Sequence, residues 1–199
     1  MRPVQQYSMM RENKVALNEE AELIEEPSER LIAWMKVIIL ASLVVLGARQ
    51  YIFEPVEVHG KSMMPTFEEN DRIILMKISE IEHSDMIVFK VAEDRNYLKR
   101  VVGIPGDVVE MNNDHLYING IETDEPYLEQ NRKVAEQLGF SQLTEDFAAV
   151  TVPAGYYFVM GDNRLNSVDS RMLGFIKGDN ILGEVKFRLS PVDHLGPVK

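Results

Sequence analysis

The sequence contains no cysteine among its 199 residues. Disulfide bonds and thiolate catalysis are therefore excluded, and the commonest soft ligands of zinc are missing. Histidine is scarce as well, and its four positions lie far apart without metal-ligand spacing. They are His59, His83, His115 and His194. We therefore expect no metal and no other cofactor.

The sequence also lacks an excess of basic residues. It has 21 Lys and Arg against 32 Asp and Glu, a formal net charge of −11. Proteins that bind nucleic acid contact its phosphates with clustered Lys and Arg, so nucleic acid is not expected as a partner. With 45% hydrophobic residues, a chain of this length can bury one main core, or a core and a small lobe.

A single long apolar run, residues 31–48, is interrupted only by Lys36 and mildly by Ser42. Its 18 residues lie near the lower limit for a membrane-spanning helix, about 17–25 residues. A buried core helix would show a polar stripe, which residues 37–48 lack. A cleavable secretory signal would begin with a short basic segment, whereas an acidic stretch precedes this run. We therefore expect three parts: an acidic tail at 1–30, a transmembrane anchor at 31–49 and a domain at 50–199.

Short apolar runs bounded by polar residues are typical of buried strands, and several occur after the anchor. They lie at residues 71–77, 85–90, 156–160 and 181–187. An Asn119-Gly120 pair between apolar residues predicts a hairpin, and residues 127–139 have a helical composition ending at a glycine. The domain is therefore expected to be mainly β, with a small α/β lobe inserted at about residues 111–150.

Ser62 is a candidate nucleophile in residues 60–66, Gly-Lys-Ser-Met-Met-Pro-Thr. Gly60 tolerates a positive φ angle, and Met64 is pushed towards an extended conformation by the proline after it. Ser62 is thus expected on a turn between two extended pieces. A lone serine in such a position is usually only a turn residue, so this motif alone establishes no chemistry.

Lys99 is a candidate base within residues 97–107, Tyr-Leu-Lys-Arg-Val-Val-Gly-Ile-Pro-Gly-Asp. Period-two alternation places it on one strand face with Tyr97 and Val101. If this face is buried, the ammonium loses hydration and its pKa falls from about 10.4 to near 7–8, where a neutral amine acts as a general base. The alternative is an edge-strand lysine whose ammonium stays in water.

Residues 161–171, Gly-Asp-Asn-Arg-Leu-Asn-Ser-Val-Asp-Ser-Arg, combine two carboxylates, two guanidiniums and two hydroxyls. One interpretation is a solvated loop that contains Asx turns. The other is a salt-bridged scaffold that holds a hydroxyl in a fixed position.

Together, these three segments resemble the type I signal peptidases, membrane-bound serine proteases with a Ser-Lys dyad that remove signal peptides from exported proteins. The segments occur in the family's order, and the resemblance extends from the anchor to about residue 188. By position, Ser62 matches the nucleophile and Lys99 the general base, while Ser167 matches the hydroxyl that hydrogen-bonds and orients the lysine. Four residues match structural supports of the site: Arg100, Asp162, Asp169 and Arg171.

The sequence departs from part of this family at Gly60. Some members have a serine there whose hydroxyl contributes to the oxyanion hole, so here the Ser62 N–H would be the main donor. Gly60 and the short lobe resemble Gram-positive members. The resemblance implies a core of antiparallel sheets at the membrane surface. Its substrates would be exported preproteins, bound as an added strand with small residues before the cut.

The resemblance also implies that residues 1–30 are cytoplasmic and residues 50–199 extracytoplasmic, with membrane lipid around a single span. Basic residues flank the span on both sides, so charge alone does not set this orientation. Two other functions stay open at this point. One is that of the self-cleaving SOS-response repressors, which use a similar Ser-Lys pair but are soluble. The other is a membrane-anchored binding module with an inactive dyad.

Overall fold

The computed structural model describes residues 27–198, with side chains described at 30–47 and 52–198. The chain divides into two compact units, Met1–Arg49 and Gln50–Lys199. Most of the expected acidic tail, residues 1–26, lies outside the described residues.

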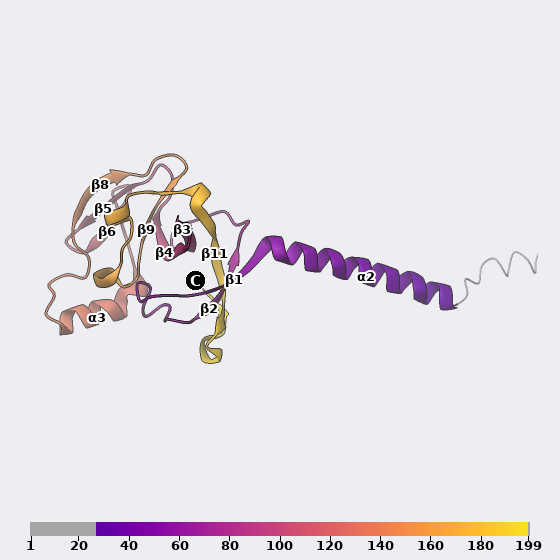
Figure 1. Ribbon diagram of the computed structural model, residues 1–199. Coiled ribbons are helices and arrows are strands. Elements are labelled where there is room, and N and C mark those ends of the chain that lie inside the picture. Colours follow the sequence, from indigo (N-terminus) through magenta and orange to yellow (C-terminus); the bar gives the residue numbers. More distant parts are fainter. Residues whose placement is uncertain (1–26, 199) are drawn as a thin grey trace, which may run out of the picture. The chain divides into compact units, whose positions relative to one another are not determined.

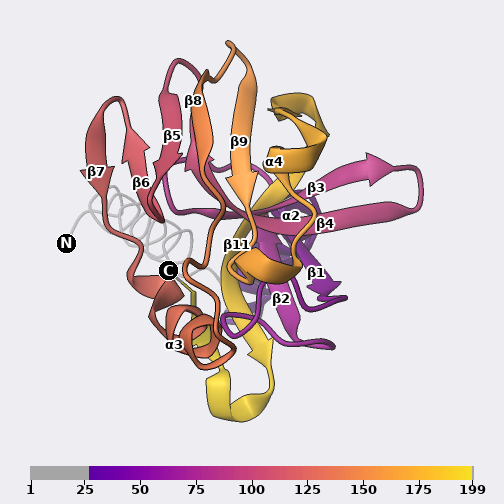
Figure 2. The ribbon, with the colours of Figure 1, turned by 90° about the vertical axis from the view of Figure 1, so that its left-hand side faces the viewer.

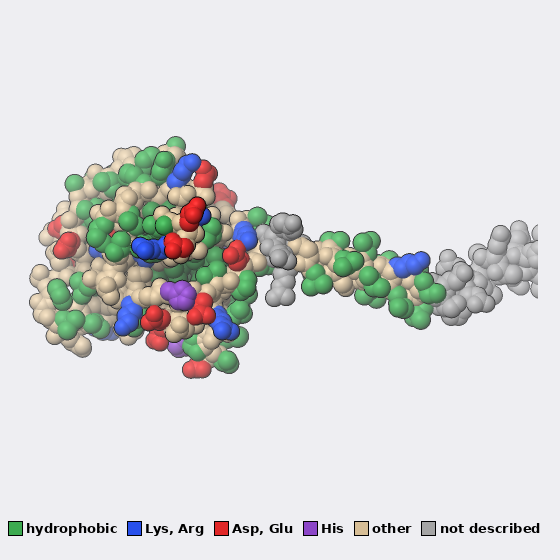
Figure 3. Space-filling view, viewed as in Figure 1, with side chains coloured by type: hydrophobic (Ala, Val, Ile, Leu, Met, Phe, Trp, Pro, Cys, Tyr) green, Lys and Arg blue, Asp and Glu red, His purple; other side chains and the backbone are tan. Residues whose placement is uncertain are grey.

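Helix α2, Pro27–Ile52, contains the apolar run (Figure 1). Its 26 residues would extend about 39 Å at the usual rise per residue. The side chains of Arg30–Gly47 are exposed, and many of those on the visible face are hydrophobic (Figure 3). Within the described residues, α2 is the one helix that is long and apolar enough to cross a membrane.

The main sheet is eight-stranded and antiparallel, in the order β1-β2-β11-β3-β4-β9-β10, with β12 paired to β11. Figure 2 labels six of these strands, β1, β2, β3, β4, β9 and β11. Its strands are β1 Phe53–Glu57, β2 Arg72–Met76, β3 Met86–Ala92, β4 Arg95–Gly103, β9 Tyr156–Met160, β10 Ile176–Lys177, β11 Ile181–Ser190 and β12 Gly196–Pro197. The apolar runs expected to be strands form β2, β3, β9 and β11. The predicted fold class, mainly antiparallel β, is therefore confirmed.

A second sheet of four strands has the order β7-β6-β5-β8 (Figure 2). Its strands are β5 Val108–Asn112, β6 His115–Ile118, β7 Ile121–Thr123 and β8 Phe147–Thr151. The short helix η1, Pro126–Leu128, and helix α3, Glu129–Gln137, lie between β7 and β8 in the chain. We call residues 108–151 the small lobe. The turn between β6 and β7 has φ values of 54° at Asn119 and 77° at Gly120, as an Asn-Gly hairpin requires.

Four short helices complete the domain: η2 Arg164–Asn166, α4 Ser170–Leu173, η3 Gly178–Asn180 and η4 Val192–His194. Two side chains of the turn that carries Ser62 pack into the core. They are Met63 and Phe67, which are 2% and 0% exposed. Both belong to a cluster with residues of β2, β3 and β11. The packing of Met63 and Phe67 thus holds the turn on the core, while Ser62 itself is half-buried.

Candidate active site

Ser62 and Lys99 are brought together by the fold, although 37 positions separate them. Lys99 Nζ lies 2.7 Å from Ser62 Oγ and also donates to the carbonyl oxygen of Leu98, at 3.0 Å. The same amine is 5.0 Å from the centre of the Tyr97 ring. A hydroxyl and a buried amine therefore share a hydrogen bond, the contact that proton transfer between them requires.

The environment of Lys99 favours its neutral form. Lys99 is 2% exposed, although its backbone in β4 pairs only with Ile87 of β3 and not with β9. Burial lowers the pKa of Lys99 from 10.5 to about 8, although the carboxylates of Asp169 and Asp162 act against this change. The alternative of a solvated edge-strand lysine is therefore wrong.

The backbone around Ser62 is held from one side by the loop that follows β9. The N–H of Asn163 donates to the Ser62 carbonyl at 2.9 Å, and the Asn163 side-chain amide donates to the Lys61 carbonyl at 3.0 Å. Gly60 has a φ of 88°, a left-handed conformation that favours glycine. Among the described residues, no hydrogen-bond acceptor is recorded for the Ser62 N–H.

Arg100 and Asp162 form a buried, two-pronged ion pair beside this loop. Nε of Arg100 lies 2.9 Å from Oδ1 of Asp162, and Nη2 lies 2.7 Å from Oδ2. The two side chains are 2% and 0% exposed. The hydroxyl of Thr66 also donates to Oδ2, at 2.5 Å, while Arg100 Nη1 donates to the Ser84 carbonyl at 2.8 Å. Asp162 thus connects β4 with the far end of the Ser62 turn.

Asp169 and Arg171 form a second pair in the same loop. Two nitrogens of Arg171 lie 2.8 Å from the two carboxylate oxygens of Asp169, and the Gly161 N–H donates to Oδ2 at 3.0 Å. Burial would raise the pKa of Asp169, but these donors outweigh burial and hold the pKa below its ordinary value. Of the two interpretations of residues 161–171, the structure therefore has the salt-bridged scaffold.

Ser167 lies in the site, but the expected hydrogen bond to Lys99 is not recorded among the described residues. Lys99 donates to Ser62 and Leu98 instead, while the buried Ser167 hydroxyl lies close enough to Asp169 to help lower the pKa of that carboxyl through a hydrogen bond. Ser167 Oγ and the Ser62 carbonyl oxygen lie 2.2 and 2.5 Å from the point where a Cβ on Gly161 would stand. Glycine at 161 therefore lets the Ser167 hydroxyl approach the backbone of Ser62.

Several contacts of the site were not singled out from the sequence. Thr66 lies in the same motif as Ser62, and Asn163 directly follows Asp162 in the sequence. Their membership of these motifs could have identified them as residues that contact the site. Tyr127 stacks on Arg100, with 4.0 Å between Cζ and the ring centre, and no motif pointed to it.

A groove of about 560 Å³ lies beside the Ser62 turn, lined mainly by residues 55–59 and 94–98. Ile73 and Val88 complete the lining. Among the described strands, β1 pairs with β2 alone, and the pairing of β4 with β9 begins only at Arg100. Unpaired edges of β1 and β4 therefore border this groove.

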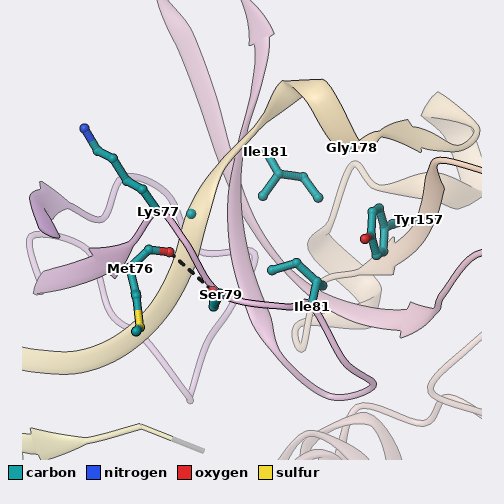
Figure 4. A pocket seen from close by; sticks show the side chains of 8 residues that line it. Met76, Lys77, Ser79, Ile81, Tyr157, Gly178 and Ile181 are labelled. Carbon is teal, nitrogen blue, oxygen red and sulfur yellow. Dashed lines mark hydrogen bonds between the residues drawn. The ribbon is translucent and has the colours of Figure 1, made fainter. Parts of the chain in front are cut away.

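A second cavity, of about 270 Å³, also has a serine and a lysine in its lining (Figure 4). There the Lys77 side chain points away from Ser79, and its amine pairs with Glu54 at 2.7 Å. Ser79 donates instead to the Met76 carbonyl, at 3.4 Å. This cavity does not repeat the Ser62–Lys99 geometry.

Within the described residues, no group of three or more His, Asp and Glu is placed to hold a metal ion.

A serine hydroxyl hydrogen-bonded to a buried lysine amine, on an antiparallel β domain, is typical of serine hydrolases in which lysine replaces histidine as the base. Residues 31–190 match the family described as signal peptidase, peptidase S26. The chain belongs to this family, as its motifs predicted.

Two relatives from Bacillus subtilis, both of similar length, agree with this assignment. Signal peptidase I S of Bacillus subtilis (strain 168) is 45% identical over 170 residues, which cover 83% of this chain and 92% of that protein. Signal peptidase I T of the same organism is 45% identical over 174 residues, or 84% and 90% of the two chains. A crystal structure of a signal peptidase I from Enterococcus faecalis V583 has 36% identity and a TM-score of 0.49, covering 54% of this chain and 97% of its own.

Replacing Asp162 with alanine should destabilise the domain strongly, because the buried Arg100 guanidinium would lose its partner. Breaking a buried ion pair in this way costs about 3–5 kcal/mol. Urea unfolding of the full chain in detergent measures the loss. Asp179→Ala is the control, since Asp179 and Lys177 form an exposed pair. Equal unfolding midpoints for the two variants would contradict this account of Asp162.

Proposed function

We propose that Ser62 and Lys99 are the nucleophile and the general base of a serine endopeptidase that removes signal peptides from exported preproteins. Membership of the signal peptidase family supports the reaction. The hydrogen bond of 2.7 Å between Lys99 Nζ and Ser62 Oγ supports the two residue roles, and it is the observation that carries the proposal. Neither a self-cleaving repressor nor an inactive binding module is favoured by this family membership.

In the proposed reaction, the neutral amine of Lys99 takes the proton of Ser62 while Oγ attacks the carbonyl carbon of the peptide bond to be cut. The resulting ammonium then gives this proton to the nitrogen of the departing chain, which leaves an ester on Ser62. In the second half, Lys99 takes a proton from water, and the hydroxide oxygen attacks the ester. The signal peptide leaves with a free carboxylate, and Ser62 regains its proton.

The Ser62 N–H is the proposed donor to the oxyanion that forms during each attack. Two observations support this role. Within the described residues, no acceptor is bonded to the Ser62 N–H, and the Ser62 carbonyl, in the peptide group that follows, is held by the N–H of Asn163. Gly60 has no hydroxyl to add to the hole. A backbone donor held by neighbouring contacts is pre-organised and does not need to reorient during the reaction.

The remaining predicted residues are proposed to support the dyad without touching the substrate. Asp162 and Arg100 hold β4 against the Ser62 turn, while Asp169 and Arg171 fold the loop around Gly161. Ser167 is proposed to orient the Lys99 amine when substrate occupies the site. Its buried hydroxyl can donate to Asp169 and still accept a hydrogen bond from the lysine, which supports this role.

The substrate is proposed to lie in the groove between residues 55–59 and 94–98 as an added strand. The unpaired edges of β1 and β4 supply backbone partners, and Val58, Ile73 and Val88 offer apolar surface to side chains. The groove thus fits an extended peptide whose residues before the cut are small and apolar.

Helix α2 is proposed to cross the membrane once, in contact with lipid, with residues 1–30 in the cytoplasm and residues 50–199 on the other side. Its length and apolar surface support a span. The side is inferred from the reaction, because exported preproteins present their cleavage sites beyond the membrane.

Ser62→Ala and Lys99→Ala should each abolish nearly all cleavage of a preprotein, because each removes one partner of the proton transfer. The double variant should lose little more than either single one, since the pair acts as a unit. Gel assays of the full chain in detergent, with matched circular dichroism spectra, measure both points. Substantial cleavage by Lys99→Ala at neutral pH would refute the dyad.

The activity of the enzyme should rise with pH, because only neutral Lys99 can accept the Ser62 proton. With the pKa of Lys99 at about 8, kcat/KM should increase about tenfold per pH unit well below this value and level off above it. Initial rates of cleavage between pH 5 and about 10 test this rise of kcat/KM. An increase that begins only near the ordinary lysine value of about 10.4 would mean that Lys99 is solvated.

The proposed orientation predicts that an epitope after Lys199 is reached by antibody or protease on intact spheroplasts. An epitope before Met1 should be reached only after the membrane is opened, and a cytoplasmic protein serves as the control for leakage. Protection of the C-terminal epitope until lysis would invert the topology and remove exported preproteins as substrates.

A further inference from the structure

Helix α3 of the small lobe contacts the backbone near Ser62 through the side chain of Asn131. The amide nitrogen of Asn131 lies 2.8 Å from the carbonyl oxygen of Met64 and 2.7 Å from that of Asp162. An amide NH₂ group has two hydrogens to donate, so both are used in this bridge.

The two acceptors belong to the two segments that hold the nucleophile. Met64 stands two positions after Ser62 in its turn. Asp162 precedes Asn163, whose N–H binds the Ser62 carbonyl at 2.9 Å. Asn131 therefore closes a ring of contacts around Ser62 and sets the distance between its turn and the loop after β9.

The position of Asn131 on α3 is unusual for a polar residue. It lies three positions after Leu128 and four before Ala135, so all three share a helix face. Leu128 and Ala135 are 0% and 2% exposed and pack with Leu143. An apolar residue is expected on such a face. An amide there is tolerated because both of its hydrogens are bonded, and its partners belong to the candidate site.

The start of the helix is itself firmly placed, so the bridge has a rigid base. Glu125 pairs with Arg164 where both side chains are almost fully buried, and Arg164 Nε donates to the Gly161 carbonyl at 3.0 Å. Tyr127 stacks on Arg100 and donates its hydroxyl to Glu125 at 2.8 Å. These contacts join the small lobe to the same loop as the Asn131 bridge.

We propose that Asn131 is a positioning residue for Ser62, an inference that rests on the proposed function of the dyad. It touches neither the reacting atoms nor the groove. Its effect is to hold the Ser62 turn at the distance from which Oγ reaches Lys99. A displacement of about 1 Å at a reacting group can lower a rate about 100-fold.

The test compares Asn131→Ala with Gln130→Ala in the full chain in detergent, using one preprotein substrate. Gln130 is the exposed neighbour on the same helix, which makes it a matched control. Asn131→Ala should lower kcat about 10- to 100-fold, with KM and the pH limb of Lys99 unchanged, because groove and lysine environment stay intact. Rates are taken far below each melting temperature and divided by the folded fraction.

Asn131→Asp provides a second variant with nearly the same shape. Its carboxylate would face two carbonyl oxygens without a hydrogen to donate, so kcat should fall at least as far as in Asn131→Ala. A purely structural role would lower the melting temperature and leave kcat per folded molecule unchanged.

The positioning role is overturned if Asn131→Ala matches Gln130→Ala in kcat, if only KM changes, or if Asn131→Asp keeps the kcat of the unaltered chain. Ser62→Ala in the same assay separates this failure from failure of the proposed function. Cleavage by Ser62→Ala would refute the dyad, whereas an inactive Ser62→Ala beside a fully active Asn131→Ala would refute the positioning role alone.

Discussion

The ion pair between Arg100 and Asp162 joins strand β4 to the loop after β9, with both side chains almost fully buried. Lys99 is the neighbour of Arg100 on β4, and Asn163, the neighbour of Asp162, binds the Ser62 carbonyl. In the proposed site, this pair therefore holds the segments that carry Ser62 and Lys99 next to each other. Both charges lose their hydration on burial, which costs free energy. Two hydrogen bonds between Arg100 and Asp162, and a third from Thr66 to Asp162, offset this cost.

The charges near Lys99 are arranged so that its amine can stay neutral. Two carboxylates lie close enough to favour the ammonium, those of Asp169 and Asp162. Each is held by its own guanidinium, Arg171 for the first and Arg100 for the second. Burial outweighs the attraction of the two carboxylates for a protonated lysine, so the pKa of Lys99 is lowered. The two ion pairs thus organise the loop, while burial makes the neutral amine available to the proposed reaction.

The small lobe contributes to this arrangement as well as to the fold. Tyr127 stacks on Arg100, and Asn131 bonds to the backbone of both segments around Ser62. A relative with a different lobe would need other contacts to hold the same turn. The groove, in contrast, is bordered by β1 and β4 of the main sheet. The small lobe therefore contacts the segments around the proposed nucleophile and does not line the groove proposed for the peptide.

The sequence by itself determined the family, the mainly β fold, the apolar helix and the turn around Ser62. These follow from local patterns: apolar runs for strands, glycine at a positive φ angle, and three motifs in a fixed order. Only the tertiary structure decided that Lys99 is buried, because its exposure depends on the packing of β4 against segments far away in the chain, among them the turn of Ser62. It also left Ser167 without the expected bond to Lys99, and it placed Asn131 against the Ser62 turn. Local alternation shows which face of a strand or helix a residue shares, whereas burial and partners depend on segments far apart in the chain, which only the folded arrangement brings together.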